Sequence, residues 1–341
     1  MLSNKENLLS ICCLGYNHGK FAADNLKAIW NSDYKDIEII VVDDGSKDDS
    51  RKILSDLAKD SPFPIKLILQ ENTGNIGRNF NNAIKEAHGE FISFIALDDM
   101  LISEKISMCI ELLKKDKKLG FVAPTVILPV DENGNTKLDA IKEGTLSQKE
   151  NVTLETLLEM EYDEFGSFYI QGVFFRKEII DAVGGFDEDI IGDDIVLRTK
   201  VFNYMINQKE YTFKLLSEPT CRYRRHSNNI SACGVRQVQI VSEYLAKYWA
   251  DREVPDVMIE WLAYVIKSQK IDDVFACLGK NLYIAKLLNN KTIQKCLIKR
   301  IKKETSLWRY IYKKEKDGNL RIATFFSFMK IKYKRDRKSV V

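Results

Sequence analysis

The first hundred residues alternate between short apolar runs and segments with helical spacing, and this rhythm restricts the fold more than any other feature of the chain. The apolar runs cover residues 8–14, 37–42, 65–69 and 91–95, and the helical segments between them cover residues 20–31, 48–59 and 77–87. Continuously apolar strands are typical of a parallel sheet that is buried on both faces. The alternation therefore predicts an α/β fold built from βαβ units, with a mostly parallel sheet and helices on both faces.

Beyond residue 100 the pattern is less regular. We expect helices over residues 103–115 and 194–207, and a further helix from Lys177 that ends at Gly184-Gly185. Strand-like runs cover residues 121–130, 167–175, 211–216 and 221–225. The polar stretch between the first two of these runs carries Asn133-Gly134, which is a turn or hairpin signal.

From about Val235 onward the pattern predicts helices and no strand. Apolar residues recur at a spacing of four, with lysines between them, at Ile293, Leu297 and Ile301, which indicates a basic amphipathic helix. Aromatic residues follow it at Trp308, Tyr310, Tyr312, Phe325, Phe326 and Phe328. We therefore predict two domains, an α/β domain over residues 1–234 and a helical C-terminal region over residues 235–341.

Charge is distributed unevenly between these two regions. The net charge is +3, but residues 291–341 alone hold 17 basic and 4 acidic residues, so the rest of the chain is acidic. A basic tail predicts an anionic partner, either a membrane surface or a nucleic acid, and the alternative is a solvated helical face. Nucleic acid is the weaker interpretation, because the acidic body offers no second basic face and no nucleic-acid-binding motif occurs.

The cysteines and the N-terminus bear on the compartment. Seven cysteines occur, an odd number with no C-x-x-C pair, which argues against a disulfide framework or a zinc site and favours a reducing cytosol. The first ten residues lack the pattern of a signal peptide, and no apolar stretch reaches the ~18–20 residues that span a bilayer. We expect a cytoplasmic protein that meets a membrane, if at all, at its surface.

Polar side chains follow each of the four predicted parallel strands. Tyr16 and Asn17 follow the first strand, Asp43 and Asp44 the second, the segment 71–79 the third, and Asp98-Asp99 the fourth. Because ligands of open α/β sheets bind beyond the carboxyl ends of the strands, we expect these side chains to converge at one edge. Taken singly, each segment is equally compatible with a turn or a helix cap.

Two of these segments are suited to a phosphorylated ligand. Asp98 and Asp99 are adjacent carboxylates, the ligands that a divalent cation prefers, although they are equally compatible with the cap of the helix near Ser103. Arg78 opens a helix after two glycines, where its guanidinium is suited to phosphate recognition, and a surface ion pair is the alternative.

Two further candidates lie later in the chain. Asp193-Asp194 precedes a helical segment, and one of these carboxylates is suited to accept a proton from a substrate hydroxyl, although acidic residues also favour the first turn of any helix. His226 ends a basic strand and is one of three histidines, so it is a candidate metal ligand or an ordinary histidine.

In this order, the motifs resemble the family 2 glycosyltransferases, which have a GT-A fold and invert the anomeric centre of the sugar. The resemblance covers residues 8–230. It depends on LGYN (14–17), VVDDGS (41–46), ENTGNIGRN (71–79), FISFIALDDM (91–100), GVFFR (172–176), GGFDE (184–188), GDDIVL (192–197) and YRRHSNNIS (223–231).

The resemblance implies a role for each candidate residue. Tyr16, Asn17, Asp43 and Asp44 would hold the nucleoside, and Arg78 would contact the base or the diphosphate. Asp98 and Asp99 match the second half of a D-x-D-D metal motif and would hold Mg2+ or Mn2+ with His226, Asp98 also facing the nucleotide. Asp194 matches the catalytic base, with Asp193 beside it in place of a Glu. The sequence departs from the family at Ala96, Ile195 and Lys200, where the family has Asp, Trp and Arg.

The resemblance also implies the reaction and the partners. We expect transfer of a sugar from a nucleoside-diphosphate sugar, with a UDP-sugar as the first choice, to a hydroxyl of a glycan or lipid-linked acceptor in cell-surface polysaccharide biosynthesis. The tail at 291–341 would then contact the inner face of the cell membrane. Two alternatives stay open: a nucleotidyltransferase, and a non-catalytic nucleotide or glycan binder.

Overall fold

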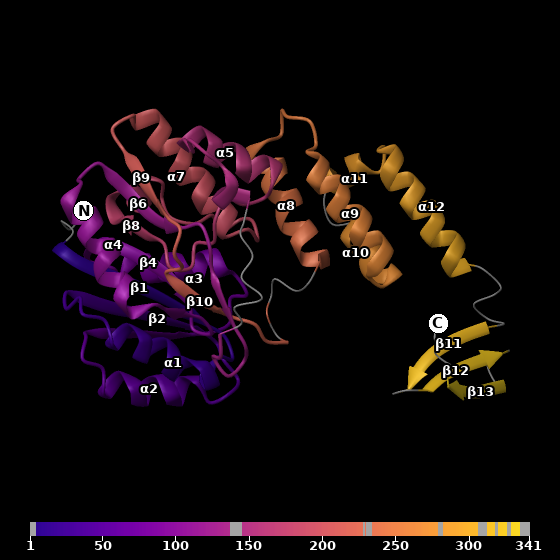
Figure 1. Cartoon of the computed structure of the whole chain (residues 1–341), viewed down its shortest axis with the longest axis horizontal. Helices are drawn as coiled ribbons and strands as arrows, with labels where there is room; N and C mark the ends of the chain where they lie inside the picture. Colours follow the sequence, from indigo (N-terminus) through magenta and orange to yellow (C-terminus); the bar gives the residue numbers. More distant parts are fainter. Residues whose placement is uncertain are drawn as a thin grey trace, which may run out of the picture. The chain divides into compact units, whose positions relative to one another are not determined.

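The computed structural model describes residues 5–136, 145–227, 229, 234–278, 282–305, 312–317, 320–325 and 329–334. The chain divides into two compact units, Met1–Pro255 and Asp256–Val341, which are described separately below (Figure 1). The first unit includes the helix α8 (Gly234–Tyr248), which the sequence analysis assigns to the C-terminal region, so the units divide after residue 255 and not after residue 234.

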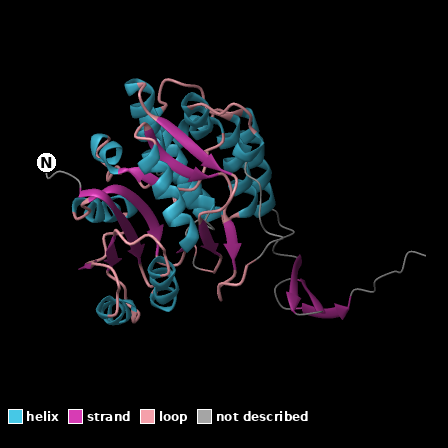
Figure 2. Ribbon diagram, turned by 60° about the vertical axis from the view of Figure 1, so that its left-hand side comes forward, coloured by secondary structure: helices cyan, strands magenta, loops and turns pink. Residues whose placement is uncertain are grey.

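A seven-stranded sheet forms the centre of the first unit, in the order β3-β2-β1-β4-β8-β6-β9 (Figures 1 and 2). The parallel part is formed by β1 (Lys5–Gly15), β2 (Ile37–Asp44), β3 (Ile65–Gln70) and β4 (Gly89–Ala96). β6 (Leu119–Pro124) and β9 (Thr212–Leu216) also pair in parallel, and only the short β8 (Phe174–Arg176) runs antiparallel to its neighbours. The predicted mostly parallel α/β sheet is confirmed.

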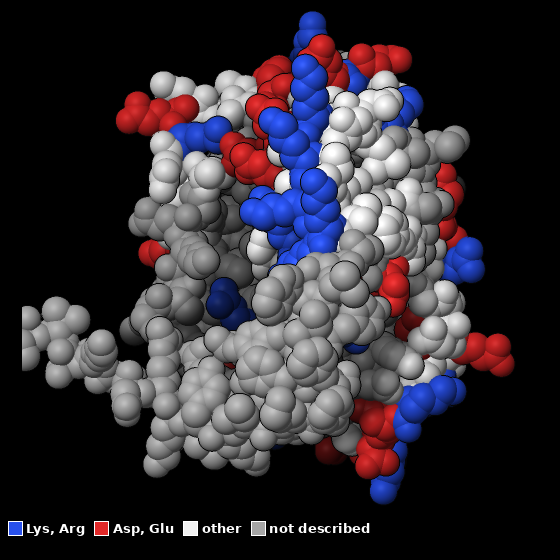
Figure 3. Space-filling view, turned by 90° about the vertical axis from the view of Figure 1, so that its right-hand side faces the viewer, with Lys and Arg blue, Asp and Glu red and all other residues white. Residues whose placement is uncertain are grey.

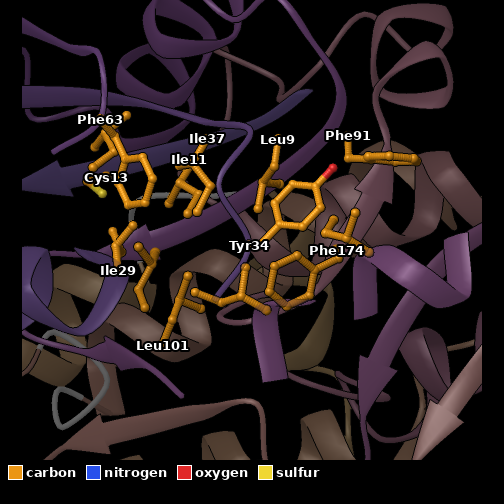
Figure 4. Close-up of a cluster of buried hydrophobic side chains, with 14 of the residues drawn as sticks. Leu9, Ile11, Cys13, Ile29, Tyr34, Ile37, Phe63, Phe91, Leu101 and Phe174 are labelled. Carbon is orange, nitrogen blue, oxygen red and sulfur yellow. The ribbon is translucent and has the colours of Figure 1, made fainter. Parts of the chain in front are cut away.

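Helices cover both faces of this sheet because successive strand residues point to opposite sides. One core cluster joins Leu9, Ile11 and Cys13 of β1 to α1 (Gly19–Trp30), α2 (Ser50–Lys59) and α4 (Ser103–Lys115) (Figure 4). The other contains Cys12 and packs against four helices: α3 (Ile76–Lys85), α5 (Leu154–Asp163), α6 (Lys177–Ala182) and α7 (Asp194–Gln208). Cys12 and Cys13 are thus buried apolar residues on opposite faces of one strand.

Two predicted strands are shorter in the structure than the sequence suggests. The apolar run 121–130 divides between β6 in the main sheet and β7 (Leu128–Val130) in a second sheet. In the run 167–175 only the last two residues belong to a strand, β8. Gly172 interrupts this run with a φ of 76°, and a Cβ there would lie 2.6 Å from Oγ1 of Thr220.

A small second sheet joins the chain just after β4 to the chain just before His226. Its order is β5-β10-β7, formed by β5 (Met100–Leu101), β10 (Cys221–Arg224) and β7. Cys221 pairs with Leu101 and Arg222 with Met100. This pairing places the segment that leads to His226 beside the turn that carries Asp98 and Asp99.

The second unit is helical and then β-stranded. Its helices are α9 (Asp256–Ser268), α10 (Ile271–Leu278), α11 (Leu282–Leu287) and α12 (Lys291–Thr305). On α12 five lysines are exposed together with Ile298 and Ile301: Lys291, Lys295, Lys299, Lys302 and Lys303. Figure 3 faces the side on which Figure 1 draws α12 and shows a stripe of Lys and Arg side chains.

The prediction that no strand follows residue 235 is wrong. Three strands form an antiparallel sheet in the order β11-β12-β13: β11 (Tyr312–Asp317), β12 (Leu320–Phe325) and β13 (Met329–Lys334). The signal was present as the alternation of apolar residues and lysines over 329–334 and as Asp317-Gly318, a hairpin dipeptide. Of the predicted aromatic group, Trp308, Tyr310, Phe326 and Phe328 lie outside the described residues.

In the part of the chain that the structure describes, we find no helix with both the length and the apolar character that a bilayer crossing requires.

Candidate active site

The loops after β1 and β2 are tied to each other at the carboxyl edge of the sheet. Asn17 has a φ of 56°, its backbone N–H donates to Oγ of Ser46 at 2.8 Å, and its Oδ1 accepts the backbone N–H of Lys47 at 2.7 Å. The neighbouring Tyr16 is 44% exposed. The edge therefore presents an aromatic ring to solvent on a firmly held turn, which is what stacking on a nucleobase requires.

Asp43 and Asp44 are both buried and well supplied with hydrogen-bond donors. Asp43 accepts the side-chain Nε of Arg51 at 2.8 Å and the backbone N–H of Ser46 at 3.1 Å. Asp44 accepts the backbone N–H groups of Thr73 and Gly74 at 2.7 and 3.1 Å. Burial by itself would raise the pKa of Asp44, but these hydrogen bonds outweigh it and lower the pKa. The carboxylate is therefore ionised and shapes the loop after β3.

Arg78 lies in the first turn of α3, where its backbone N–H is capped by Oδ1 of Asn75 at 2.9 Å. The Arg78 side chain is 51% exposed, and its Nε lies 3.0 Å from Oε2 of Glu188 in an ion pair. The structure thus contains the surface ion pair that was the alternative interpretation of this residue. A solvent-exposed pair of this kind is weak enough to exchange its partner for a phosphate.

Asp98 and His226 meet at this edge, and His18 joins them. Oδ2 of Asp98 lies 2.9 Å from Nε2 of His226, and Oδ1 of Asp98 lies 3.6 Å from Nδ1 of His18. One ligand atom from each of the three residues lies within 4.8 Å of the other two. Burial lowers the pKa of His18, and the nearby Asp98 charge opposes that effect. A neutral imidazole can act as a metal ligand.

The unsatisfied atoms at this cluster test whether a divalent cation fits it. Nδ1 of His18 and Oδ1 of Asp98 are buried and have no hydrogen-bond partner in the part of the chain described. Buried polar atoms normally have partners, so two facing orphans require an explanation such as an ion. The donor set of one carboxylate and two imidazoles fits a divalent cation.

Asp99 occupies a different environment from Asp98. Its Oδ1 accepts the backbone N–H of Arg224 at 2.8 Å, while Nε of Arg224 donates to the backbone carbonyl of Asp98 at 2.8 Å. Burial and then the charge of Asp98 raise the pKa of Asp99. Neither aspartate caps a helix, because α4 begins after Ile102. Asp99 therefore fixes the turn against β10, and in this arrangement Asp98 carries the carboxylate that faces the histidines.

Asp193 and Asp194 stand at the start of α7. Asp193 is the N-cap residue but its side chain makes no capping hydrogen bond, and Asp194 is the first helical residue. Oδ2 of Asp194 accepts the backbone N–H of Ile170 at 3.3 Å and lies 3.7 Å from Arg198, and the side chain is 25% exposed. Burial and the charge of Asp193 raise the pKa of Asp194 to about 7, against the opposing effect of Arg198. A carboxylate with these properties is suited to general base catalysis near neutral pH.

A buried ion pair holds the surroundings of Asp194 in place. Nε and NH2 of Arg198 each donate to Glu161 at 2.9 Å, one to each carboxylate oxygen, and both side chains are buried. Glu161 also accepts the backbone N–H and the hydroxyl of Ser167, three residues before Ile170, whose backbone N–H reaches Asp194. Arg198 is therefore paired with Glu161, and the pKa of Asp194 stays raised although Arg198 lies 3.7 Å away.

The segment 169–172 joins the two acidic groups. The backbone of Ile170 contacts Asp194, and Oε1 of Gln171 accepts the backbone N–H of Ala96 at 2.8 Å, at the end of β4. The charge of Asp194 also contributes to the raised pKa of Asp99. Tyr169, 51% exposed, packs against Tyr223 of β10 with 5.8 Å between ring centroids.

The structure places four further residues at the candidate site that the sequence does not single out: His18, Arg224, Glu161 and Arg198. His18 follows the Tyr16-Asn17 motif directly, and its position after the first parallel strand was the available signal. In the sequence, Arg224 is one of several basic residues in the strand that His226 ends, and nothing distinguishes it from its neighbours. Glu161 and Arg198 lie in amphipathic helices, where charged residues are expected to face solvent, and only the packing of α5 on α7 buries them. Of the motif 223–231, Asn228, Ile230 and Ser231 lie outside the described residues.

Comparison with solved structures identifies the fold. The chain superposes on TarS of S. aureus in complex with UDP-GlcNAc with a TM-score of 0.60 at 15% identity, covering 93% of this chain and 97% of the other. It also superposes on the mannosyltransferase PcManGT of Pyrobaculum calidifontis in complex with GDP-Man and Mn2+, with a TM-score of 0.50 at 18% identity over 88% and 87% of the two chains. The fold is that of the GT-A glycosyltransferases, as the sequence predicts.

Sequence comparison identifies the family. The model of the family described as "Glycosyl transferase family 2" matches residues 10–184, more than half of the chain. The chain belongs to glycosyl transferase family 2, and it is therefore a glycosyltransferase.

Three relatives show how far the similarity extends. An uncharacterized glycosyltransferase of Nostoc sp. is 26% identical over 68% of this chain and 69% of its own length. The GalNAc(5)-diNAcBac-PP-undecaprenol beta-1,3-glucosyltransferase of Campylobacter jejuni is 28% identical over 57% and 59%. The poly-beta-1,6-N-acetyl-D-glucosamine synthase of Staphylococcus epidermidis is 29% identical over 56% and 45%. The matched region is therefore less than two thirds of the length of the Campylobacter and Staphylococcus relatives.

Proposed function

We propose that this protein transfers a sugar, with inversion at the anomeric carbon, from a UDP-sugar to a hydroxyl group of a glycan or lipid-linked acceptor in cell-surface polysaccharide biosynthesis. One observation carries the proposal: the site contains both a cluster suited to a cation, formed by Asp98 and two histidines, and a carboxylate suited to act as a base, Asp194 with its raised pKa. The TarS complex with UDP-GlcNAc supports a UDP-sugar donor. The name of the Campylobacter relative, which includes PP-undecaprenol, supports a lipid-linked acceptor.

The donor would bind across the ends of β1, β2 and β4. Tyr16 would stack on the base, and Asn17, Asp43 and Asp44 would shape the nucleoside pocket. Arg78 would exchange Glu188 for the base or the diphosphate. Asp98, Asp99 and His226 would hold Mg2+ or Mn2+, Asp98 and His226 as ligands and Asp99 by fixing the turn. When bound, the cation would stabilise negative charge on the diphosphate leaving group.

The acceptor would approach from the side of Asp194. Its hydroxyl oxygen attacks the anomeric carbon as the bond to the diphosphate oxygen breaks, and its proton passes to the carboxylate of Asp194. Asp193 would keep the pKa of Asp194 high enough for the carboxylate to accept that proton. The Tyr169–Tyr223 pair lies on the adjoining segment and would give a sugar ring an apolar face.

The test is a panel of nucleotide sugars incubated with the full chain, Mn2+ and a mixture of glycan and lipid-linked acceptors. Release of a nucleoside diphosphate from a UDP-sugar, with an inverted anomeric centre in the product, is the expected result. Release of pyrophosphate would identify a nucleotidyltransferase instead. Nucleotide binding without transfer or hydrolysis would identify a non-catalytic binder, the alternative that Ala96 in the metal motif keeps open.

The basic helix α12 would place the enzyme at the cytoplasmic face of the membrane. It exposes five lysines beside Ile298 and Ile301, the combination of charge and apolar side chains that interfacial helices use. Each lysine near an anionic surface contributes about 1 kcal/mol. Replacement of Lys295, Lys299 and Lys302 by Glu should abolish recovery on anionic vesicles, with neutral vesicles as the control. Unchanged recovery would contradict the membrane assignment.

A further inference from the structure

The side chain of His18 does not cap the helix that it precedes; its ring lies edge-on to Phe21 of α1, with 6.2 Å between centroids. His18 is the N-cap residue of α1, but its side chain makes no capping hydrogen bond. The helix start uses its backbone carbonyl, which accepts the N–H groups of Phe21 and Ala22. The imidazole is therefore not used for capping, and the backbone of His18 is held by its hydrogen bonds to the first turn of α1.

Its imidazole instead points at Asp98. Nδ1 of His18 lies 3.6 Å from Oδ1 of Asp98, which is too long for a hydrogen bond. Both atoms are buried, and neither has a hydrogen-bond partner in the described part of the chain. The side chains are only 21% and 11% exposed, so water compensates poorly for the missing partners. A shared cation would satisfy both atoms at once.

The spacing matches a common coordination sphere. Metal–ligand bonds of about 2.0–2.2 Å place two ligand atoms on one ion at most about 4.4 Å apart. The three atoms from His18, Asp98 and His226 lie within 4.8 Å of one another, so shifts of a few tenths of an ångström complete the site. The two imidazole rings lie at 82° to each other with centroids 6.2 Å apart, and each presents one nitrogen to the carboxylate.

The sequence also shows why a third ligand is needed. Ala96 stands at the first position of the metal motif and supplies no carboxylate, while Asp99 is held by the backbone of Arg224. We propose that His18 is the third protein ligand of the cation, and that the resulting site of two imidazoles and one carboxylate selects first-row transition metals over Mg2+. This inference rests on the proposed function only in placing that cation against the donor diphosphate.

The chemistry of the ligands gives the selectivity. Carboxylate, carbonyl and water oxygens suit Mg2+, whereas imidazole nitrogen suits transition metals, for which affinity rises from Mn2+ to Co2+. Replacing a carboxylate by a neutral imidazole also removes one negative charge from the site. The lost charge weakens all divalent cations, whereas the exchange of an oxygen ligand for a nitrogen ligand weakens Mg2+ more than Co2+.

The experiment is calorimetric titration of the nucleotide-free full chain with MgCl2, MnCl2 and CoCl2. The unmodified protein should bind Co2+ at least about tenfold more tightly than Mg2+. His18→Gln should weaken Co2+ binding by at least about tenfold, because even the loss of an outer hydrogen-bond partner costs 10–100-fold in metal affinity. The visible absorption of bound Co2+ should change in the same variant, which reports the lost nitrogen ligand directly.

Two further variants complete the test. His88→Gln removes the third histidine of the chain, which is exposed and lies beside Glu38, and should leave metal binding unchanged. His18→Asp restores a charged ligand and should recover binding while shifting selectivity toward Mg2+. Co2+ binding and a Co2+ spectrum that are unchanged in both His18 variants would overturn the proposal and leave an ordinary His–Asp contact.

The result is separable from the proposed function. Co2+ binding that depends on His18, without nucleoside diphosphate release from any donor, would support the ligand assignment and contradict the transferase proposal. Transfer activity with Co2+ binding that is insensitive to His18 would do the reverse.

Discussion

Two carboxylates of the candidate site, Asp44 and Asp194, are held in opposite ways. On the donor side, Asp44 receives two backbone N–H groups, and its pKa is lowered despite burial. On the acceptor side, Asp194 receives one long hydrogen bond, and its pKa is raised by burial and by Asp193. The environment therefore keeps Asp44 ionised and gives Asp194 the pKa of a proton acceptor.

This contrast shows how one chain separates binding from chemistry. A carboxylate saturated with donors holds a loop in shape and changes little during a reaction. A carboxylate that lacks donors keeps its affinity for a proton, so it can act on a substrate hydroxyl.

Replacing Asp194 by Asn removes the proton acceptor. A general base contributes roughly 10²–10⁴-fold to rate, so kcat should fall by about that factor. Binding of UDP, measured by calorimetry, should be unchanged, because the proposed nucleoside pocket is formed by residues at the ends of β1 and β2 and not by α7. Asp56→Asn, an exposed change of the same kind on α2, is the control. Full turnover in Asp194→Asn would remove the base assignment.

Replacing Glu161 by Ala leaves the buried Arg198 without its partner. Breaking a buried ion pair in this way costs about 3–5 kcal/mol in the free energy of unfolding. The matched variant Glu159→Ala breaks an exposed pair with Arg252 and should cost about 1 kcal/mol or less. Urea unfolding measures both. Equal losses in the two variants would show that the Glu161–Arg198 pair does not hold this region together.

Replacing Asp44 by Asn tests the donor side. An amide cannot accept the Thr73 and Gly74 N–H groups on both of its polar atoms, and leaving one buried donor unpaired costs about 1–3 kcal/mol. The KM for the donor should rise while kcat at saturating donor is retained. A kcat that falls as far as in Asp194→Asn would erase the distinction between the two groups.

Replacing Asp193 by Asn should give the smallest effect. Turnover requires Asp194 in its ionised form, so the rate should rise with pH through a pKa of about 7 in the unmodified protein. The charge of Asp193 is the second cause of this raised pKa, after burial. Without it the pKa of Asp194 falls, and the acidic limb of the kcat/KM profile should move to lower pH. A limb that stays in place would mean that another group titrates.

Much of the first unit could be predicted from sequence because its signals are local. Continuous apolar runs and helical spacing identified the four parallel strands and the helices between them, and the polar residues after each strand follow from the geometry of parallel sheets. The strands β11–β13 were missed because they follow a long helical pattern and because β11 consists of charged residues after Tyr312, so it has no apolar alternation.

The site was less predictable because its geometry depends on long-range contacts. Asp98 and Asp99 are adjacent in sequence, and contacts from distant residues separate their environments. Asp99 accepts the backbone N–H of Arg224, 125 residues away, whereas Asp98 contacts His226. The histidine pair depends on β5 and β10 meeting in a second sheet. The surroundings of Asp194 depend on the packing of α5 on α7, which buries Glu161 and Arg198 together.

A crystal structure of the full chain with a UDP-sugar and Mn2+ tests the central claim most directly. The account predicts the diphosphate and cation at Asp98 and His226, with the anomeric carbon of the sugar facing Asp194 across the segment 169–172. A nucleotide bound in a cavity that Asp194 does not face would contradict it.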